Sequence, residues 1–122
     1  MKRELQDLRE RTKQFALRII RLYGALPGQV EAQVIGKQLL RSGTSVGANY
    51  REAYRARSDA EYIAKLGLCL QELEETMYWL DLLIEAELIT PTQLAPLKDE
   101  TNQLIAIFIT TIKNKKSKRY EV

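Results

Sequence analysis

Apolar residues spaced alternately three and four positions apart recur in four stretches of this 122-residue chain. Only an α-helix brings positions with that period onto one face, where they can pack against the same faces of neighbouring helices. Two of the stretches carry an unbroken seam: Leu5, Leu8, Thr12, Phe15, Ile19 and Leu22 in the first, and Ile63, Leu66, Leu70, Leu73, Met77, Leu80 and Ile84 in the third. No strand pattern or internal repeat accompanies them, so the sequence predicts an all-α fold.

Residues that stop helices separate the first two stretches. Gly24 tolerates the left-handed backbone of a helix C-cap, and Pro27 cannot continue a helix. We therefore expect the first helix over residues 3–23 and the second over residues 29–56.

The last two helices begin with capping signals. Ser58 with Glu61, and Thr90 with Gln93, match the capping-box pattern, in which two side chains satisfy the first free amides of a helix. The third helix is expected to end near Glu87. Because all the connections are short, consecutive helices should run antiparallel, and one domain built as an up-down-up-down four-helix bundle follows.

The fourth helix changes character towards its end. Between Leu104 and Ile112 the apolar residues cover more than one stripe. This width exceeds what one bundle core requires and indicates that Phe108 and its neighbours also face a second subunit. A basic run starts at Lys113. We therefore divide the chain into a bundle, residues 1–112, and a basic C-terminal tail, residues 113–122, expected to be frayed or disordered.

Residues 41–53 of the second helix are poor in large apolar side chains. Small residues let two backbones approach closely, so this segment predicts tight packing against another helix, another subunit or a ligand. Its two glycines each disfavour a helix interior by about 1 kcal/mol relative to alanine, which also permits a kink near Gly43 in one long helix. Trp79 lies beside the seam of the third helix and is assigned to an interface. The candidate interface residues are Gly43, Ser45, Gly47, Asn49, Trp79 and Phe108.

The chain contains no histidine, which removes the usual general base and the ligand pattern of di-iron bundles. Glu52, Glu72 and Glu75 are the carboxylates expected to face inward, and pairing with Lys, Arg or hydroxyl groups explains them better than a metal does. No glycine-rich phosphate loop in a strand–loop–helix context is present. The sequence therefore predicts no catalytic residues, no metal and no cofactor.

Cysteine usage and hydropathy bear on the compartment. The one cysteine, Cys69, cannot form an internal disulfide, and its apolar neighbours indicate a buried thiol. No apolar run is long enough to span a bilayer, and the N-terminus resembles a charged helix rather than a signal peptide. We expect a cytoplasmic protein with no membrane association.

Basic residues gather around the end of the second helix and at the C-terminus, in a chain of net charge +3 and pI near 9.0. Arg51 and Arg55 share a helix face, and Tyr50 and Tyr54 are interleaved with them. Such cations contact phosphates, and tyrosines stack on unpaired bases. A solvated helix end with a solubilising tail explains the same residues without a ligand. The candidate nucleic-acid-binding residues are Arg41, Arg51, Arg55, Arg57, Lys65, Lys113, Lys115, Lys116, Lys118 and Arg119.

The run Arg41-Ser42-Gly43-Thr44-Ser45-Val46-Gly47-Ala48-Asn49-Tyr50-Arg51-Glu52-Ala53, together with Ser58 and residues 62–66 and 72–80, carries a family resemblance. It resembles the four-helix-bundle proteins related to those encoded by intervening sequences in bacterial 23S ribosomal RNA genes, a group that includes the accessory variability protein of diversity-generating retroelements. The resemblance covers about residues 8–113.

The resemblance implies a ring-like homopentamer, with the small-residue segment where helices or subunits meet. For the retroelement member it implies binding of a reverse transcriptase and of nucleic acid through basic surfaces. It makes Arg41, Arg51 and Lys65 the best candidates for carried-over function, whereas Arg41 is equally well explained as a partner of Glu52 or Glu72.

These observations favour a non-enzymatic, homo-oligomeric bundle, pentameric by resemblance, that acts as a nucleic-acid or ribonucleoprotein accessory. RNA or DNA and a retroelement reverse transcriptase are the expected partners. The alternative is a protein-interaction scaffold whose basic residues only keep it in solution. A metal or small-molecule site in the bundle core is a third possibility.

Overall fold

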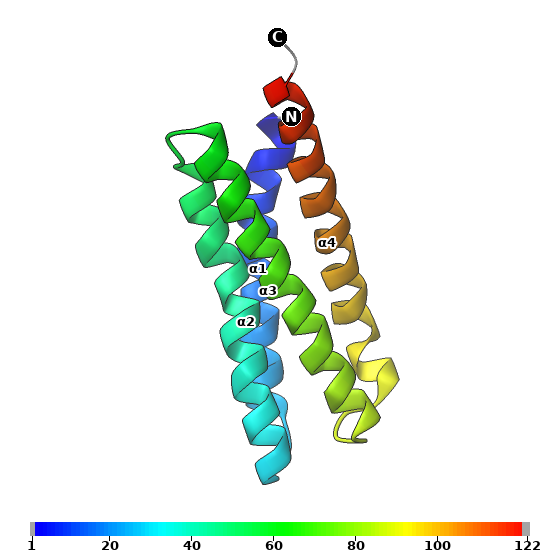
Figure 1. The fold of residues 1–122 in the computed structure, drawn as a ribbon. Coiled ribbons are helices and arrows are strands. Elements are labelled where there is room, and N and C mark those ends of the chain that lie inside the picture. Colours follow the sequence, from blue (N-terminus) through cyan, green and yellow to red (C-terminus); the bar gives the residue numbers. More distant parts are fainter. Residues whose placement is uncertain (1, 121–122) are drawn as a thin grey trace.

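The computed structural model describes the backbone of residues 2–120 and the side chains of residues 8–118. The described backbone forms four helices: α1 (Lys2–Ala25), α2 (Val30–Tyr54), α3 (Asp59–Glu85) and α4 (Pro91–Tyr120). They run alternately up and down, so the start of α1, the α2–α3 connection and the end of α4 lie at one end of the molecule (Figure 1). The predicted all-α, antiparallel four-helix bundle is confirmed.

The helix boundaries follow the capping chemistry at two of the four starts. Ser58 Oγ accepts a hydrogen bond from the amide of Glu61 at 3.1 Å. The Thr90 hydroxyl accepts one from the amide of Gln93 at 3.2 Å, and the Gln93 side chain accepts one from the Thr90 amide at 3.1 Å, which completes a capping box. These contacts satisfy amides that the first turn of a helix leaves free.

The helix ends differ from the expectation. No glycine has a positive φ among the described residues, so Gly24 is not a left-handed cap, and α1 continues to Ala25. α3 ends at Glu85, and Glu87 has a φ of 60° in the connection that follows. A carboxylate-bearing residue therefore adopts the left-handed conformation that glycine usually occupies.

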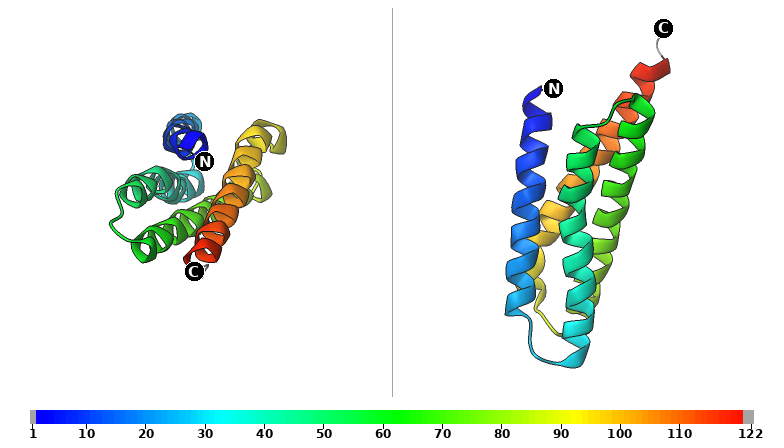
Figure 2. Two further views of the ribbon diagram at one scale, coloured as in Figure 1. Left: turned by 90° about the horizontal axis from the view of Figure 1, so that it is seen from above. Right: turned by 90° about the vertical axis from the view of Figure 1, so that its left-hand side faces the viewer.

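The four helices do not pack equally. α2 lies against both α1 and α3, and α4 lies against α3, whereas α1 and α4 approach each other less closely (Figure 2). The core is made by seam residues from all four helices. It includes Leu8, Phe15, Ile19, Leu39, Val46, Tyr50, Leu66, Leu73, Leu80, Leu104 and Phe108.

Two aromatic residues that were predicted to lie at binding surfaces are in the core. Tyr50 and Phe108 are fully buried, and their rings pack edge to face with centroids 5.7 Å apart. Phe108 is therefore a core residue rather than an interface residue, because it continues the seam that Leu104 carries. Tyr50 is likewise closed to any base that would stack on it.

The small-residue segment packs against α1 of the same chain. A Cβ atom at Gly43 would lie 2.7 Å from Cγ1 of Ile19, and one at Gly47 would lie 3.3 Å from the carbonyl oxygen of Thr12. The glycines thus let the two backbones approach, and α2 continues through them without the break that was considered near Gly43. Ser45 and Asn49 are partly exposed beside this contact.

The basic run at the C-terminus is helical, in contrast to the frayed tail expected from residue 113. α4 continues to Tyr120 as a single helix. Lys115 Nζ lies 3.1 Å from Asp59 Oδ1 of α3 and 5.7 Å from the ring centroid of Tyr62. The run contains no glycine or proline, and this contact with α3 supports its continuation.

Among the described helices, none combines the length and the apolar character that a bilayer crossing demands.

Candidate nucleic-acid interface

The antiparallel topology brings most of the predicted basic residues, but not Arg41, to one end of the bundle. The end of α2, the start of α3 and the end of α4 meet there (Figure 1). Residues 51–65 and 113–118 carry eight Lys and Arg side chains against three carboxylates. We call this surface the basic end; its net charge is positive, which suits an anionic partner.

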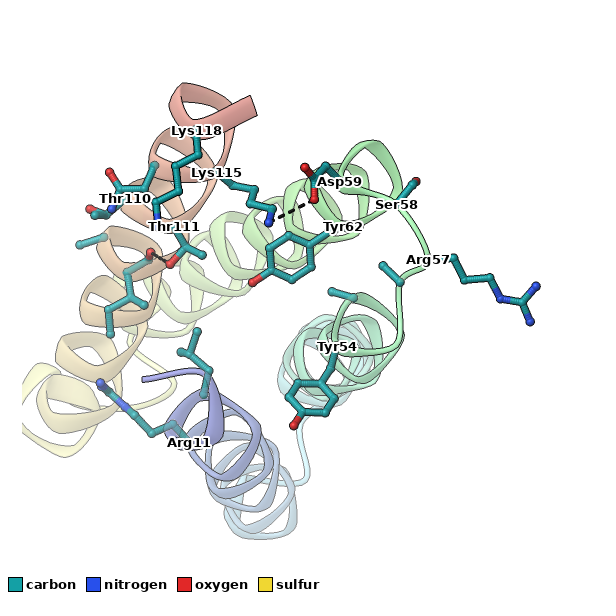
Figure 3. A pocket seen from close by; sticks show the side chains of 16 residues that line it. Arg11, Tyr54, Arg57, Ser58, Asp59, Tyr62, Thr110, Thr111, Lys115 and Lys118 are labelled. Carbon is teal, nitrogen blue, oxygen red and sulfur yellow. Dashed lines mark hydrogen bonds and ion pairs between the residues drawn. The ribbon is translucent and has the colours of Figure 1, made fainter. Parts of the chain in front are cut away.

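Three arginines of the basic end are exposed. Arg51 and Arg55 lie on the last turns of α2, and Arg57 lies in the connection to α3. None of them makes an ion pair with another described residue. The Arg57 amide donates to Glu61 Oε2 at 3.1 Å, while its guanidinium points away from the bundle (Figure 3). Guanidinium groups in this position are free to form two hydrogen bonds each with a phosphate.

An aromatic ring with a cation above it lies beside these arginines. Tyr54 of α2 is exposed, and the guanidinium carbon of Arg9 on α1 lies 4.5 Å from its ring centroid. This contact adds a fourth cation that sequence reasoning missed. The sequence signals this contact only by placing Arg9 next to Leu8, a residue of the apolar seam. The contact itself depends on how α1 lies against α2.

Lys65 is less available than the arginines. Its ammonium group donates to Glu52 Oε1 at 2.8 Å, and this hydrogen bond raises the pKa of Lys65. Glu52 is thus a partner of Lys65 rather than of Arg41. A phosphate would have to displace a carboxylate at this position.

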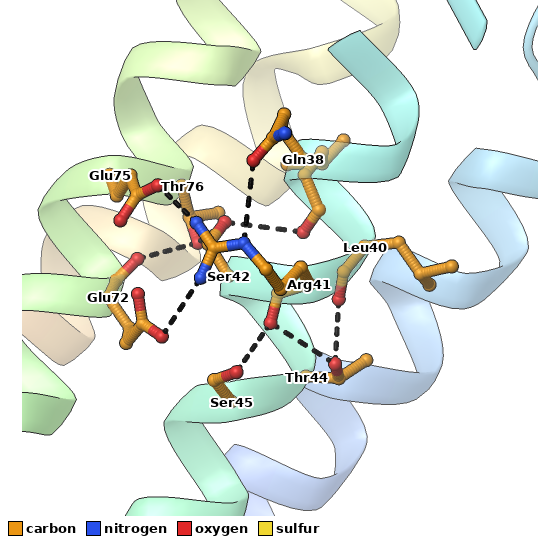
Figure 4. A network of polar contacts seen from close by, with 10 residues as sticks. Gln38, Leu40, Arg41, Ser42, Thr44, Ser45, Glu72, Glu75 and Thr76 are labelled. Carbon is orange, nitrogen blue, oxygen red and sulfur yellow. Dashed lines mark hydrogen bonds and ion pairs between the residues drawn. The ribbon is translucent and has the colours of Figure 1, made fainter. Parts of the chain in front are cut away.

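Arg41 lies away from the basic end and ties α2 to α3 (Figure 4). Its guanidinium pairs with Glu75 and lies 3.5 Å from Glu72 Oε2, and its Nε donates to Gln38 Oε1 at 3.4 Å. The predicted pairing with Glu72 is confirmed, although the Arg41 side chain is 51% exposed and so is not a buried partner. Ten residues of helix, roughly 15 Å, separate it from Arg51.

A buried polar pair lies next to Arg41. The hydroxyls of Ser42 and Thr76 are 2.9 Å apart and wholly buried between α2 and α3 (Figure 4). Burial of the neighbouring Glu72 carboxyl raises its pKa. No group of three His, Cys, Asp or Glu side chains is arranged to hold a metal within the described part of the chain. The carboxylates and hydroxyls that could suggest a metal site in the sequence therefore join α2 to α3.

The lysines near the end of α4 differ in whether they form an ion pair. Lys113, Lys116 and Lys118 are exposed and form no ion pair with a described residue, whereas Lys115 pairs with Asp59. The Arg119 side chain lies outside the described residues. The exposed lysines extend the positive surface beyond the bundle.

Large apolar side chains are exposed on both α3 and α4. The ion pairs Asp59–Lys115 and Asp81–Lys98 set the register of the two antiparallel helices. Leu68 of α3 is 42% exposed and Ile109 of α4 is 49% exposed. We call these two residues the α3–α4 patch; the exposed neighbour of Phe108, rather than Phe108 itself, supplies the wide apolar face of the fourth helix.

Trp79 lies further along α3 and is half-buried. It packs against the core and meets the exposed ring of Tyr78 edge to face, with centroids 5.0 Å apart. Its indole Nε1 is buried and has no hydrogen-bond partner in the described structure. Buried indole N–H groups usually have an acceptor, so this side chain is incompletely satisfied in the single chain.

The comparisons with known proteins agree with this architecture. Residues 4–110 match the model of the 23S rRNA-intervening sequence protein family. A crystal structure of a protein of unknown function from the S23 ribosomal protein family of Bacteroides thetaiotaomicron superposes with a TM-score of 0.84 at 41% sequence identity, over 89% of this chain and 97% of that one. Among curated proteins, no relative matches the chain.

The matched residues include the whole small-residue segment, the parts of α2 and α3 that pack against each other, and most of α4. The chain belongs to the 23S rRNA-intervening sequence protein family.

Proposed function

We propose that this protein is a non-enzymatic, homo-oligomeric accessory of a nucleic acid or ribonucleoprotein in the cytoplasm. The observation that carries the proposal is the set of exposed arginines Arg51, Arg55 and Arg57, which form no ion pair with a described residue and gather at one end with the exposed ring of Tyr54. Arginines contact phosphates, and exposed tyrosines stack on unpaired bases. Structured RNA is the first ligand to test, with duplex DNA as the comparison.

The oligomer that we propose is a pentamer. The α3–α4 patch and the unsatisfied Trp79 indole support a contact between copies, because exposed apolar residues and incompletely bonded aromatic groups favour burial. The resemblance to the retroelement accessory protein adds a reverse transcriptase as the proposed protein partner. These surfaces lie on α3 and α4, so assembly and binding at the end of α2 use different residues.

The binding experiment is fluorescence anisotropy of labelled RNA across a salt series. Arg51→Glu with Arg55→Glu should abolish binding near physiological salt and leave the oligomer intact. A matched control is Arg21→Glu with Lys37→Glu, which makes the same change in charge on exposed residues of α1 and α2 outside the basic end. Equal losses for the two double variants would mean that net charge alone governs binding, and the proposed interface would be wrong.

The assembly experiment is light scattering during size exclusion. A pentamer of a 14.1 kDa chain has a mass of about 70 kDa. Leu68→Lys with Ile109→Lys should reduce this mass, because two lysines on the α3–α4 patch oppose its burial. An unchanged mass would show that copies meet elsewhere.

A protein-interaction scaffold is the second candidate function. The exposed Tyr78 ring against Trp79 favours it, since aromatic residues are enriched at protein interfaces. This candidate predicts nucleic-acid binding that disappears with modest salt for the wild-type protein itself. The same anisotropy series therefore separates the two functions.

A further inference from the structure

A cavity of about 780 Å³ lies at the basic end, between all four helices (Figure 3). It forms where α1 and α4 approach each other less closely than the other neighbouring helices do. Its volume falls in the range of pockets that bind small organic ligands. The residues around it differ in chemistry from one wall to the other.

One wall is apolar and aromatic. Leu8 of α1, Ala53 of α2 and Ile107 of α4 contribute aliphatic surface, and Tyr62 of α3 contributes a half-buried ring. The Tyr62 hydroxyl points into the space between the helices and has no hydrogen-bond partner among the described residues (Figure 3). Burial raises the pKa of Tyr62, so the phenol is protonated and able to donate at neutral pH.

A cationic wall from α4 adjoins this ring, since Lys115 Nζ lies 5.7 Å from the Tyr62 ring centroid. Lys115 is held by Asp59 at 3.1 Å, and Lys118 lies one turn further on the same face with no ion pair to a described residue. Thr110 and Asn114 add a hydroxyl and an amide between them. This wall thus offers charge for an anion and hydrogen-bonding groups beside it.

Two other cations at the rim are directed elsewhere. Arg11 Nη2 lies 2.7 Å from Glu100 Oε1, and the Arg57 side chain points away from the cavity (Figure 3). The cations that remain for an anion in the cavity are Lys118, which forms no ion pair with a described residue, and Lys115, where the anion would compete with the Asp59 carboxylate.

We propose that this cavity binds a nucleoside monophosphate unit, with the phosphate on Lys115 and Lys118 and the nucleoside against Tyr62 and the apolar wall. A flat heteroaromatic base suits the ring and the aliphatic surface, and a ribose supplies hydroxyls for the Tyr62 and Thr110 oxygens. The unit comes either from a free nucleotide or from the terminal nucleotide of a strand. The second source rests on the proposed nucleic-acid function, because such a strand would also cross Arg51 and Arg55.

Titration calorimetry with AMP and UMP on the full chain tests the cavity itself. Lys115→Gln with Lys118→Gln should weaken binding by about tenfold or more, since both charge-assisted contacts to the phosphate are lost. The matched control is Lys113→Gln with Lys116→Gln, which removes two charges from the same turns of α4 but from residues that do not line the cavity. The control should keep the wild-type affinity.

A third variant examines the aromatic wall. Tyr62→Phe keeps the ring and removes only the hydroxyl, so it should weaken AMP binding by a smaller factor than the lysine pair while leaving the melting temperature close to that of the wild type. Circular dichroism melts of every variant confirm that a loss of binding is not a loss of fold.

Three results would overturn the inference. One is the absence of any AMP or UMP binding at millimolar nucleotide. Another is equal weakening by the cavity pair and the control pair of lysines. The third is competition by inorganic phosphate as strong as that by AMP, since the apolar wall would then contribute nothing.

Linear and circular oligonucleotides of one sequence separate the two sources of the nucleotide. If a strand end occupies the cavity, the linear form with a 5′ phosphate binds more tightly than the circle, and the Lys115→Gln, Lys118→Gln variant loses that advantage. If only free nucleotide enters, AMP binds while linear and circular strands behave alike. If the protein binds AMP but binds no RNA, the proposed nucleotide site in the cavity is supported and the proposed accessory function is wrong.

Discussion

The hydroxyls of Ser42 and Thr76 meet 2.9 Å apart at the centre of the contact between α2 and α3, where neither side chain has any exposed surface. Thr76 donates its one hydroxyl proton to the Glu72 carbonyl at 2.8 Å, so the proton between the two hydroxyls comes from Ser42. The Leu39 carbonyl, 3.3 Å from Ser42 Oγ, is the alternative acceptor for that proton. The pair therefore joins two helices, and Thr76 also keeps a bond within its own helix.

This pair should show strong coupling in a double-mutant cycle. Ser42→Ala or Thr76→Val alone should lower the free energy of unfolding by roughly 1–2 kcal/mol, because each leaves a buried hydroxyl with one partner fewer. The double variant should cost clearly less than the sum of the two single variants. Urea denaturation measures all four free energies, and strict additivity would show that the two hydroxyls do not interact.

Gly43 should tolerate alanine poorly. Its added Cβ would press on Ile19 at 2.7 Å, and overpacking of a core typically costs about 1–3 kcal/mol, which exceeds the gain of about 1 kcal/mol in helix propensity. Gly67 is the control, because it lies inside α3 with nothing within 4 Å of an added Cβ. We expect Gly67→Ala to raise the melting temperature and Gly43→Ala to lower it. If both variants melt at a higher temperature than the wild type, the close approach of α1 does not explain the glycine at position 43.

The stability of the bundle should depend on pH through Glu72. Burial raises the pKa of this carboxyl above its usual value of 4.5, so in the window above that pH the folded state holds a proton that the unfolded chain has released. The stabilisation is therefore complete below about pH 4.5 and is lost as the pH rises through the folded pKa.

Glu72→Gln removes this titration but keeps the shape of the side chain. The wild-type protein should lose stability relative to the variant as the pH rises from about 4.5 towards neutrality, measured by urea denaturation at each pH. Glu74→Gln, an exposed carboxylate on the same helix, serves as the control and should leave the profile of the wild type unchanged. A difference between the wild type and Glu72→Gln that is constant with pH would contradict the raised pKa.

Truncation after Ile112 should separate stability from binding. The removed segment contributes one described ion pair, Lys115 to Asp59, and exposed pairs are worth about 0–1 kcal/mol. Thermal melts should therefore show a bundle of nearly unchanged stability, while AMP binding disappears together with the lysine wall. A large fall in melting temperature would show that the end of α4 packs more tightly than this one ion pair indicates.

The sequence predicted the four helices because the seam and the capping boxes are local signals. Ser58 and Thr90 start their helices through contacts three residues away, and such contacts do not depend on the rest of the fold. The end of α3 was placed less well, since Glu87 adopts a left-handed conformation without the glycine that usually marks it.

The candidate site was predicted in part. Arg51, Arg55 and Arg57 gather at one end, as the antiparallel topology requires, and none forms an ion pair with a described residue. Their use for nucleic acid stays a proposal. Lys65 was not recognised as a partner of Glu52, because that contact crosses from α3 to α2 and leaves no periodic signal.

The sequence prediction was wrong where the role of a residue depends on which side of the helix it occupies. Phe108 and Ile109 are adjacent in a broad apolar run, and one is core while the other is surface. The cavity was not predicted at all, since it depends on the angle at which α4 diverges from α1 rather than on any motif. The apolar period of a sequence predicts that helices pack together, but it does not predict the angles between them or the cavities that these angles leave.

The concentration of cations at one end has a consequence for how the molecule meets a partner. The opposite end carries Glu31 at the start of α2, Glu85 at the end of α3 and Glu87 in the connection to α4, so the bundle has an electric dipole along its length. In the field of a polyanion the protein would turn before contact and arrive with the α2–α3 connection first, which raises the fraction of productive encounters. The charge arrangement therefore acts at a distance, on orientation and association rate, before any side chain touches a phosphate.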